Sequence, residues 1–131
     1  MTIHQSLNPP GWPRAKGYSN GITAQGRIVF VAGLIGWNEK EEIVSDDFVD
    51  QFRQALTNIK AVLAEAGAGP EHMVRMTWFI SDKEEYLSRL KEVGAVYRDI
   101  MGKNYPAMAV IVVKGFIEDG AKLEIETTAV V

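Results

Sequence analysis

Apolar residues recur at intervals of three and four in two stretches of the chain, which is the spacing of one buried face of an α-helix. In the first stretch, Ser45 is a candidate N-cap and Gly67 suits the C-terminal cap. Asp46 and Asp47 suit the positive end of the helix dipole. The apolar stripe of this predicted helix consists of Phe48, Phe52, Leu56, Ile59, Leu63 and Ala66.

The second predicted helix starts in the sequence Ser81-Asp-Lys-Glu84, which has the pattern of a capping box. We expect one continuous helix from this point to Gly102, because the apolar spacing continues without a break. Its apolar face carries Tyr86, Leu90, Val93, Tyr97 and Ile100.

Runs of β-branched and aromatic residues predict the strands. Residues 22–33 have the pattern of a hairpin, in which a turn at Gln25 and Gly26 leads into a buried strand that ends at Gly33. The first 16 residues are rich in Pro, Gly and Asn and are expected to form an extended arm. Further strands are expected at residues 73–80, 107–113 and 122–130.

The predicted order of strands and helices indicates an α+β fold, with two helices packed on one face of a sheet. Each helix has only one apolar face, so the helices can cover only one side. The strand at residues 107–113, however, is apolar on both faces, and the strand at residues 73–80 places Met73 and Phe79 opposite Met76 and Trp78. A strand with two apolar faces needs two covers. Another copy of the chain is the most economical second cover, so the pattern predicts a homo-oligomer.

Composition narrows the class of protein. The chain has 131 residues, which is the size of one domain over residues 1–131. It has no cysteine, which excludes disulfides, thiol catalysis and thiolate metal sites. The net charge of −3 argues against a nucleic-acid partner. The longest apolar run is far shorter than the roughly 20 residues of a membrane span. We therefore expect a cytoplasmic protein with no membrane or nucleic-acid partner.

One short motif is misleading. Residues 17–21 match the G-x-S-x-G nucleophile elbow, and Ser19 is followed by aspartates and then by His72, in the order of a hydrolase triad. The elbow needs a strand before it and a helix after it, whereas here an arm precedes and a strand follows. We therefore reject the triad. His4 and His72 also have no partner at the spacing of metal ligands, so no metal site is expected.

The last predicted strand alternates regularly between apolar and polar residues. Leu123 and Ile125 share one face, while Glu124 and Glu126 share the other. If the polar face meets a neighbouring subunit, one of these carboxylates is held at a half-buried interface, where its pKa can be raised toward a value suited to acid–base chemistry. The alternative is a solvated edge strand with alternating charges.

Several segments together resemble one known family. They are Gly17-Tyr-Ser-Asn, Val29-Phe-Val-Ala-Gly33, the first predicted helix, Val74-Arg-Met-Thr-Trp-Phe-Ile80, Tyr105-Pro-Ala107 and Leu123-Glu-Ile-Glu126. In this order and spacing, nearly the whole chain after residue 16 is similar to the RidA family, also called YjgF/YER057c/UK114. The resemblance implies a chorismate-mutase-like fold with a mixed sheet, assembled as a homotrimer with small-molecule pockets at the subunit interfaces.

The resemblance also implies an activity. Enzymes of the family hydrolyse reactive enamines and imines, such as 2-aminoacrylate and its imine tautomer, to 2-keto acids and ammonia, without a cofactor. By this resemblance, Glu124 positions the attacking water and Tyr18 closes the pocket, and both are the expected catalytic residues. The backbone of Gly33 is expected to line the pocket.

The chain departs from the best-known branch of the family at several positions, and the most consequential is the one that binds the substrate carboxylate. An arginine directly after Pro-Ala binds the substrate carboxylate there, whereas this chain has Met108. A thioether cannot make the bidentate charged contact of a guanidinium. The chain therefore resembles the arginine-lacking branches, some members of which are 2-aminomuconate deaminases of aromatic degradation. The expected substrate-binding residues are Gly33, Met108, Ala109, Val110 and Trp37, of which Met108 and Trp37 favour a larger, flatter or less acidic substrate.

Two functions from different classes are left open by the sequence. One is hydrolytic deamination of an imine or enamine, with the substrate unidentified. The other is a non-catalytic small-molecule-binding or regulatory trimer that kept the pocket and lost the chemistry. A ribonuclease activity has also been attached to the family, but the acidic composition and the lack of a basic stripe argue against it.

Overall fold

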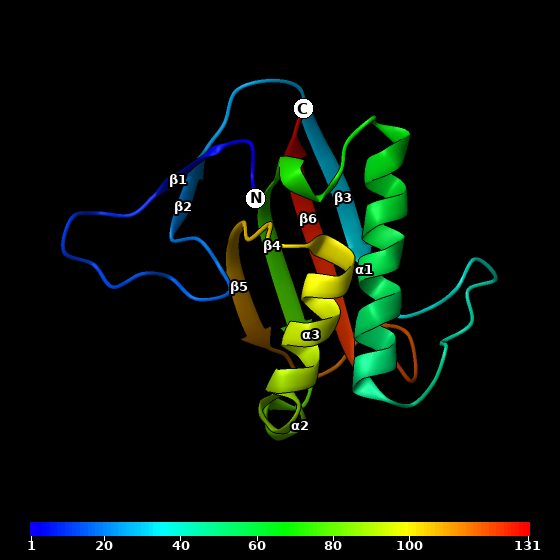
Figure 1. The fold of residues 1–131 in the computed structure, drawn as a ribbon. Coiled ribbons are helices and arrows are strands. Elements are labelled where there is room, and N and C mark those ends of the chain that lie inside the picture. The colour runs from blue at the N-terminus through cyan, green and yellow to red at the C-terminus, as the bar shows by residue number, and fades with distance from the viewer.

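The computed structural model describes residues 1–131 and contains a four-stranded sheet, helices on one side of it and a separate two-stranded ribbon (Figure 1). None of the helices is both long and apolar enough to span a lipid bilayer. The strands are β1 (Gln5–Leu7), β2 (Gly21–Thr23), β3 (Ile28–Leu34), β4 (Met73–Ile80), β5 (Ala107–Val112) and β6 (Leu123–Val130). The helices are α1 (Phe48–Glu65), α2 (Lys83–Ser88) and α3 (Leu90–Met101), with a short 3₁₀ turn at Pro70–His72.

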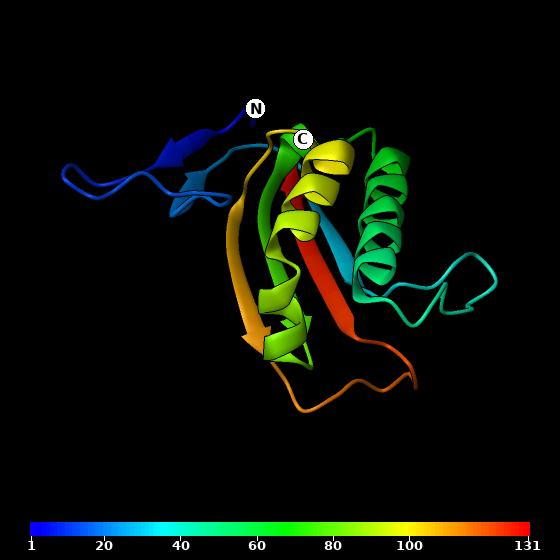
Figure 2. The same ribbon diagram turned by 60° about the horizontal axis from the view of Figure 1, so that its bottom comes forward.

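The main sheet has the strand order β3-β6-β4-β5 and is mixed. The strands β4 and β5 run parallel, while β6 is antiparallel to both of its neighbours. The helices α1 and α3 lie side by side on one face of this sheet, as the turned view in Figure 2 shows. The α+β class and the placement of two main helices on one face are therefore confirmed.

The predicted hairpin at residues 22–33 is wrong. The strand β2 pairs with β1, and β3 pairs with the last strand, β6. The C-terminal end of the chain takes the place of the expected partner: Arg27 and Val131 exchange two backbone hydrogen bonds of 2.9 Å. Gly26, with φ of 147°, allows this close approach, because a side chain there would collide with the Val131 carbonyl group.

The first 16 residues are also more than an extended arm. The strand β1 lies within them, and its ribbon with β2 stands beside the β5 edge of the sheet (Figure 1). His4 attaches the start of the chain to the main body: its Nε2 lies 2.9 Å from the Val130 carbonyl oxygen and 3.2 Å from that of His72.

Both predicted helices form, but their ends differ from the prediction. The N-cap of α1 is Asp47, whose carboxylate accepts a hydrogen bond of 3.0 Å from the backbone N–H of Asp50. Ser45 supports this cap from outside the helix: its hydroxyl accepts from the Asp47 N–H and donates to the Asp50 carboxylate. Gly67 follows α1 with φ of 70°, the left-handed conformation expected of a residue that ends a helix.

The second predicted helix is interrupted at Arg89, which divides it into α2 and α3. The side chain of Arg89 forms ion pairs with Asp47 at the start of α1 and with Glu92 on α3, at 2.9 and 2.8 Å. The hydrogen bond from Arg89 holds the pKa of the Asp47 carboxyl below its usual value. The junction between the two helices is thus fixed by a contact with α1 that lies far away in the sequence, so local periodicity does not reveal it.

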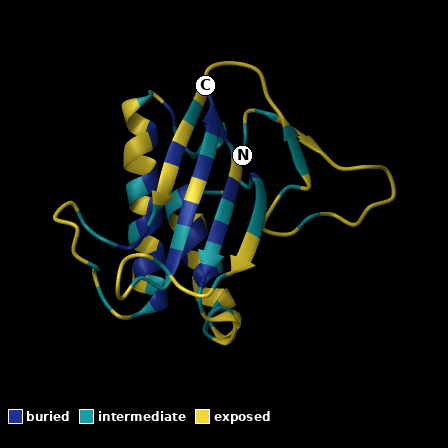
Figure 3. Ribbon diagram, turned by 180° about the vertical axis from the view of Figure 1, so that it is seen from behind, coloured by how far each residue is buried: buried dark blue, intermediate teal, exposed yellow.

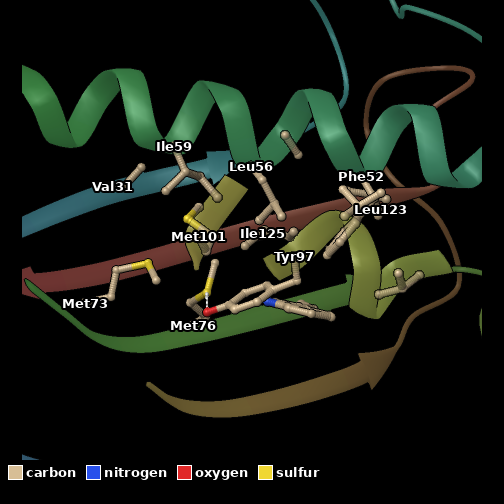
Figure 4. Packing of buried hydrophobic residues seen from close by; sticks show 14 of the residues in the cluster. Val31, Phe52, Leu56, Ile59, Met73, Met76, Tyr97, Met101, Leu123 and Ile125 are labelled. Carbon is tan, nitrogen blue, oxygen red and sulfur yellow. Dashed lines mark hydrogen bonds between the residues drawn. The ribbon is translucent and has the colours of Figure 1, made fainter. Parts of the chain in front are cut away.

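The core lies between the helices and the sheet (Figure 4). The alternating residues Leu123, Ile125, Thr127 and Ala129 of β6 are all buried, as their spacing predicted. Met73 is buried on the same side as Met76, contrary to the prediction, because the pairing of β4 with β6 shifts its register between Met73 and Arg75. The large buried side chains of the helices include Phe52, Leu56, Ile59, Leu63 and Met101.

The opposite face of the sheet has no cover within the chain. Phe30 and Ile28 of β3 are 77% and 57% exposed, and Ile111 of β5 is 43% exposed. Figure 3 turns this face to the viewer, and exposed and half-buried segments alternate with buried ones along the strands. The expected second apolar face is therefore present, and we call it the open face.

Candidate functional site

A cavity of about 400 Å³ lies between the edge strand β5 and the helix α3. This volume is within the range of small-molecule sites in proteins. Most of the side chains around it are apolar or aromatic. The lining residues are Lys16, Gly17, Tyr18, Trp78, Tyr86, Leu90, Val93, Gly94, Tyr97, Arg98, Tyr105, Met108, Ala109 and Val110.

Tyr18 reaches this cavity because its segment is attached to the start of β5. The backbone N–H of Ser19 donates to the Pro106 carbonyl at 3.0 Å, and the Ser19 hydroxyl donates to the Tyr105 carbonyl at 2.5 Å. Gly17 makes the turn into this segment with φ of 74°. The Ser19 hydroxyl is therefore a structural donor.

The geometry also excludes the hydrolase triad. His72, the histidine that the triad would need, uses its Nδ1 to accept a hydrogen bond of 2.9 Å from the Gly69 N–H. It lies directly before β4, next to Glu71. No group of three or more histidine, aspartate or glutamate side chains comes together to hold a metal ion.

Stacked aromatic rings form one wall of the cavity. Tyr97 and Tyr105 stack with ring centroids 5.3 Å apart and an angle of 14° between their planes, and Trp78 lies 5.9 Å from Tyr97. The Tyr97 hydroxyl donates to the Asn104 carbonyl and also contacts the sulfur of Met76 (Figure 4). Burial raises the pKa values of the Tyr97 and Tyr86 phenols above their usual values, so neither serves as a base near neutral pH.

The expected binding residues Met108, Ala109 and Val110 also line this cavity, together with the expected catalytic residue Tyr18. Met108 pairs in register with Met76, whose side chain is buried beneath the helices. Met108 therefore points to the helix side of the sheet.

Glu124 lies on the other side. It pairs in register with Phe79, between the buried residues Leu123 and Ile125, and so belongs to the open face. Gly33 lies against it: a Cβ atom on Gly33 would be 2.8 Å from the Glu124 carboxyl carbon. Glycine is thus the residue that lets the backbone of β3 approach this carboxylate.

A β-bulge shapes the backbone beside Glu124. Val31 pairs with Thr127 and Leu34 pairs with Ile125, so Ala32 and Gly33 together face a single residue of β6. Bulges often occur next to active sites, because they take backbone groups out of the regular pairing and redirect the chain. The Glu124 carboxylate also lines a hollow formed by Lys114, Gly115, Phe116 and Ile117 from the loop before β6.

The residues expected at one site therefore lie in three different parts of the folded protomer. Tyr18, Met108, Ala109 and Val110 share the cavity, while Gly33 and Glu124 share the open face. Trp37 is in neither place: it lies in the loop after β3, where its carbonyl oxygen accepts a hydrogen bond of 2.8 Å from Asn58 on α1.

Several cavity residues were not expected from the sequence. Trp78 and Tyr97 belong to a strand and a helix whose spacing indicates core residues, and both are indeed almost fully buried. Arg98 is adjacent to Tyr97 and has the ordinary pattern of an exposed helix residue. The one available signal was Tyr105, which directly precedes the Pro-Ala pair of the family motif.

Comparisons with known proteins agree with this fold. A family profile described as endoribonuclease L-PSP matches residues 12–131. The crystal structure of YyfB from Yersinia pestis, of the conserved Rid protein family and of unknown function, has a TM-score of 0.87 and 28% identity over 98% of both chains. That of Rv2704 from Mycobacterium tuberculosis, a member of the YjgF/YER057c/UK114 family, is 35% identical over 88% of this chain and 87% of that one, with a TM-score of 0.65.

A relative with a name that proposes an activity is TdcF of Escherichia coli, described as a reactive intermediate deaminase. It is 32% identical over 80% of each chain. The profile match covers most of the chain, and the four-stranded sheet, the helices and the Gly33–Glu124 contact lie within it. This chain therefore belongs to the endoribonuclease L-PSP family, which is the RidA or YjgF/YER057c/UK114 family.

Proposed function

We propose that this protein hydrolyses a reactive imine or enamine to a carbonyl compound and ammonia, as a member of an arginine-lacking branch of its family. Members of the family are reactive intermediate deaminases. The observation that carries the proposal is the contact between Glu124 and the bulged backbone at Gly33, which holds one carboxylate beside an accessible hollow. Such a carboxylate can orient and deprotonate a water molecule.

The reaction needs only water and proton transfers. The water oxygen adds to the carbon of the C=N bond, and a proton from the water reaches the nitrogen. The hydroxyl proton of the resulting aminoalcohol passes to the nitrogen, the C–N bond breaks, the carbonyl group forms, and ammonia leaves. An enamine enters the same sequence after its N–H proton has moved to the β-carbon, which converts it to the imine. Glu124 accepts the proton of the water and returns it to the nitrogen, while Tyr18 and the cavity hold the substrate.

Two copies of the chain are needed to bring these parts together. Within one protomer the cavity opens at the edge strand β5 on the helix side, whereas Glu124 lies on the open face. We infer that the open face is covered by neighbouring copies in a homotrimer. The cavity of one protomer then meets Glu124 of its neighbour, and each substrate binds between two subunits.

An assay with mixed subunits tests this arrangement. The variant Glu124→Gln lacks the base, and Gly94→Leu fills the cavity, where a Cβ atom would meet only the Arg98 guanidinium, at 3.5 Å. Each variant alone is expected to be inactive toward an imine made in place by an amino-acid oxidase. Trimers assembled from equal amounts of both variants are expected to recover about a quarter of the wild-type rate, because one in four random neighbour pairs joins an intact cavity to an intact Glu124.

A mixture that stays as inactive as its components would contradict a shared site. If the wild-type protein and Glu124→Ala give equal rates, the non-catalytic binding function is favoured instead. The absence of an arginine at position 108 is the observation that supports this second function.

Assembly through the open face can be tested at Phe30. This side chain is 77% exposed in the single chain, and Phe30→Asp places a charge on the open face, within the expected interface. We expect this variant to be a monomer by light scattering at micromolar concentration and to lose imine turnover. Val62→Asp, on the outer side of α1, changes an exposed apolar residue in the same way and is expected to remain a trimer. A wild-type protein that is itself monomeric would contradict the inferred assembly.

A further inference from the structure

The charges around the cavity have one sign. Lys16 and Arg98 are its only charged lining residues, and no aspartate or glutamate lines it. The chain as a whole carries a net charge of −3, so this local excess of positive charge runs against the overall composition. A ligand that complements the cavity is therefore an anion.

Arg98 is free to bind such a ligand. The other arginine beside the cavity-forming helices, Arg89, is occupied by Asp47 and Glu92. The guanidinium of Arg98 takes part in none of the ion pairs of the chain. It extends back along α3 over Gly94, where the absence of a side chain leaves it room at the cavity wall.

A second, independent feature points to a bound acceptor. Trp78 is only 7% exposed, it lines the cavity, and its indole Nε1–H is buried without a hydrogen-bond partner in the chain. A buried donor without a partner is costly, and an acceptor atom on a ligand would satisfy it.

The uncharged walls of the cavity indicate what the uncharged part of the ligand is. The stacked rings of Tyr97 and Tyr105, the Trp78 ring and the Met108 thioether offer flat, polarisable surface and no further charge. Such walls favour an aromatic or conjugated planar group over a short aliphatic one.

We propose that Arg98 binds the carboxylate of a planar, aromatic or conjugated substrate in this cavity, in place of the arginine that is absent at position 108. That the bound molecule is a substrate rests on the proposed deamination, whereas the anion site itself does not depend on catalysis. Arg98 acts as a binding residue that determines specificity, and the Trp78 indole donates to a second acceptor atom of the ligand.

Calorimetric binding of benzoate to the whole protein tests the assignment, with benzamide as a neutral ligand of the same shape and acetate as a small anion. Benzoate is expected to bind at least about tenfold more tightly than either, because a charged hydrogen bond and ring contacts are both used. Arg98→Gln is expected to weaken benzoate binding by about tenfold or more and to leave benzamide unchanged. Lys91→Gln removes the same charge from an exposed position on α3 outside the cavity and is expected to change the affinity less than twofold.

The indole N–H signals of the protein give a second readout. The chain has three tryptophans, and Trp78→Phe identifies the Trp78 signal by its loss. Benzoate is expected to shift that signal and to leave the Trp12 and Trp37 signals in place.

The outcomes separate this inference from the proposed function. An absence of saturable benzoate binding, equal affinity for benzamide, or unchanged affinity in Arg98→Gln overturns the anion site, even if the protein is an active deaminase. Binding of benzoate that depends on Arg98, together with no imine turnover by the wild-type protein, supports the anion site and contradicts deamination.

Discussion

Replacing Glu124 with glutamine is expected to lower imine turnover by about 10²- to 10⁴-fold, which is the usual contribution of a positioned general base. Glutamine has nearly the same shape, so it still fits beside Gly33 and the loop before β6. Its amide cannot accept the proton of the attacking water. The loss is expected mainly in kcat, because the cavity that holds the substrate is unchanged. The measurement is the initial rate of imine loss and of ammonia release, with light scattering to establish the same assembly.

The matched control is Glu65→Gln, which removes the same charge from the exposed side of α1 and is expected to keep the wild-type rate. Gly33→Ala tests position separately from charge. Its methyl group would lie 2.8 Å from the Glu124 carboxyl carbon and must displace that carboxylate. We expect a loss of activity in a folded protein, because the far end of a glutamate side chain can move. Wild-type rates in both Glu124→Gln and Gly33→Ala would contradict the assignment of Glu124 as the base.

Replacing Gln51 with alanine is expected to destabilise the protein by about 3–5 kcal/mol, which is near the upper limit for a single substitution. Gln51 is fully buried on α1, and its amide joins the helix to the segment before it and to the end of the loop before β6. Its Nε2 donates to the carbonyls of Ser45 and Gly120, and its Oε1 accepts from the Lys122 N–H, all at 2.9 Å. Alanine leaves these backbone groups without their partner and also leaves a void.

The backbone around Gln51 is as tightly packed as its side chain. A Cβ atom on Gly36 would be 2.5 Å from the Gln51 Cα, so the loop after β3 rests directly on the helix. Because relaxation is restricted there, the segment cannot close the void. The measurement is the free energy of unfolding in denaturant. All variants are compared at one protein concentration, because the apparent stability of an oligomer depends on it.

The control for this prediction is Gln54→Ala, on the same helix. Gln54 is half-buried and its amide reaches only Asn58, so a cost of about 1 kcal/mol or less is expected. Equal costs for the two variants would mean that Gln51 does not hold these segments together.

Local patterns in the sequence predicted much of the fold. The stripe on α1 and the alternation of Leu123, Ile125, Thr127 and Ala129 correspond to buried faces in the structure. The uncovered apolar residues that predict a second cover are also present on the open face. These features depend on the periodicity of one helix or strand, which neighbouring residues determine by themselves.

The site could be predicted only in part. The family resemblance names Tyr18, Gly33, Glu124 and Met108, but it does not say that they lie on two faces of one sheet. Arg98 and Trp78 have no signal of their own, because an exposed helix arginine and a strand tryptophan are ordinary residues. They acquire a common role only where α3 packs beside β5.

The sequence by itself determined the positions of α1 and of the four strands of the main sheet, and the apolar faces of α1 and β6. Only the tertiary structure decided that β3 pairs with β6, that Met73 joins the core side through a register shift, and that α2 and α3 separate at Arg89. The physical reason is the distance in sequence over which each feature is determined. Periodicity is a property of a few consecutive residues, whereas strand partners, bulges and the Arg89–Asp47 ion pair depend on groups tens of residues apart, whose contacts form only when the whole chain has folded.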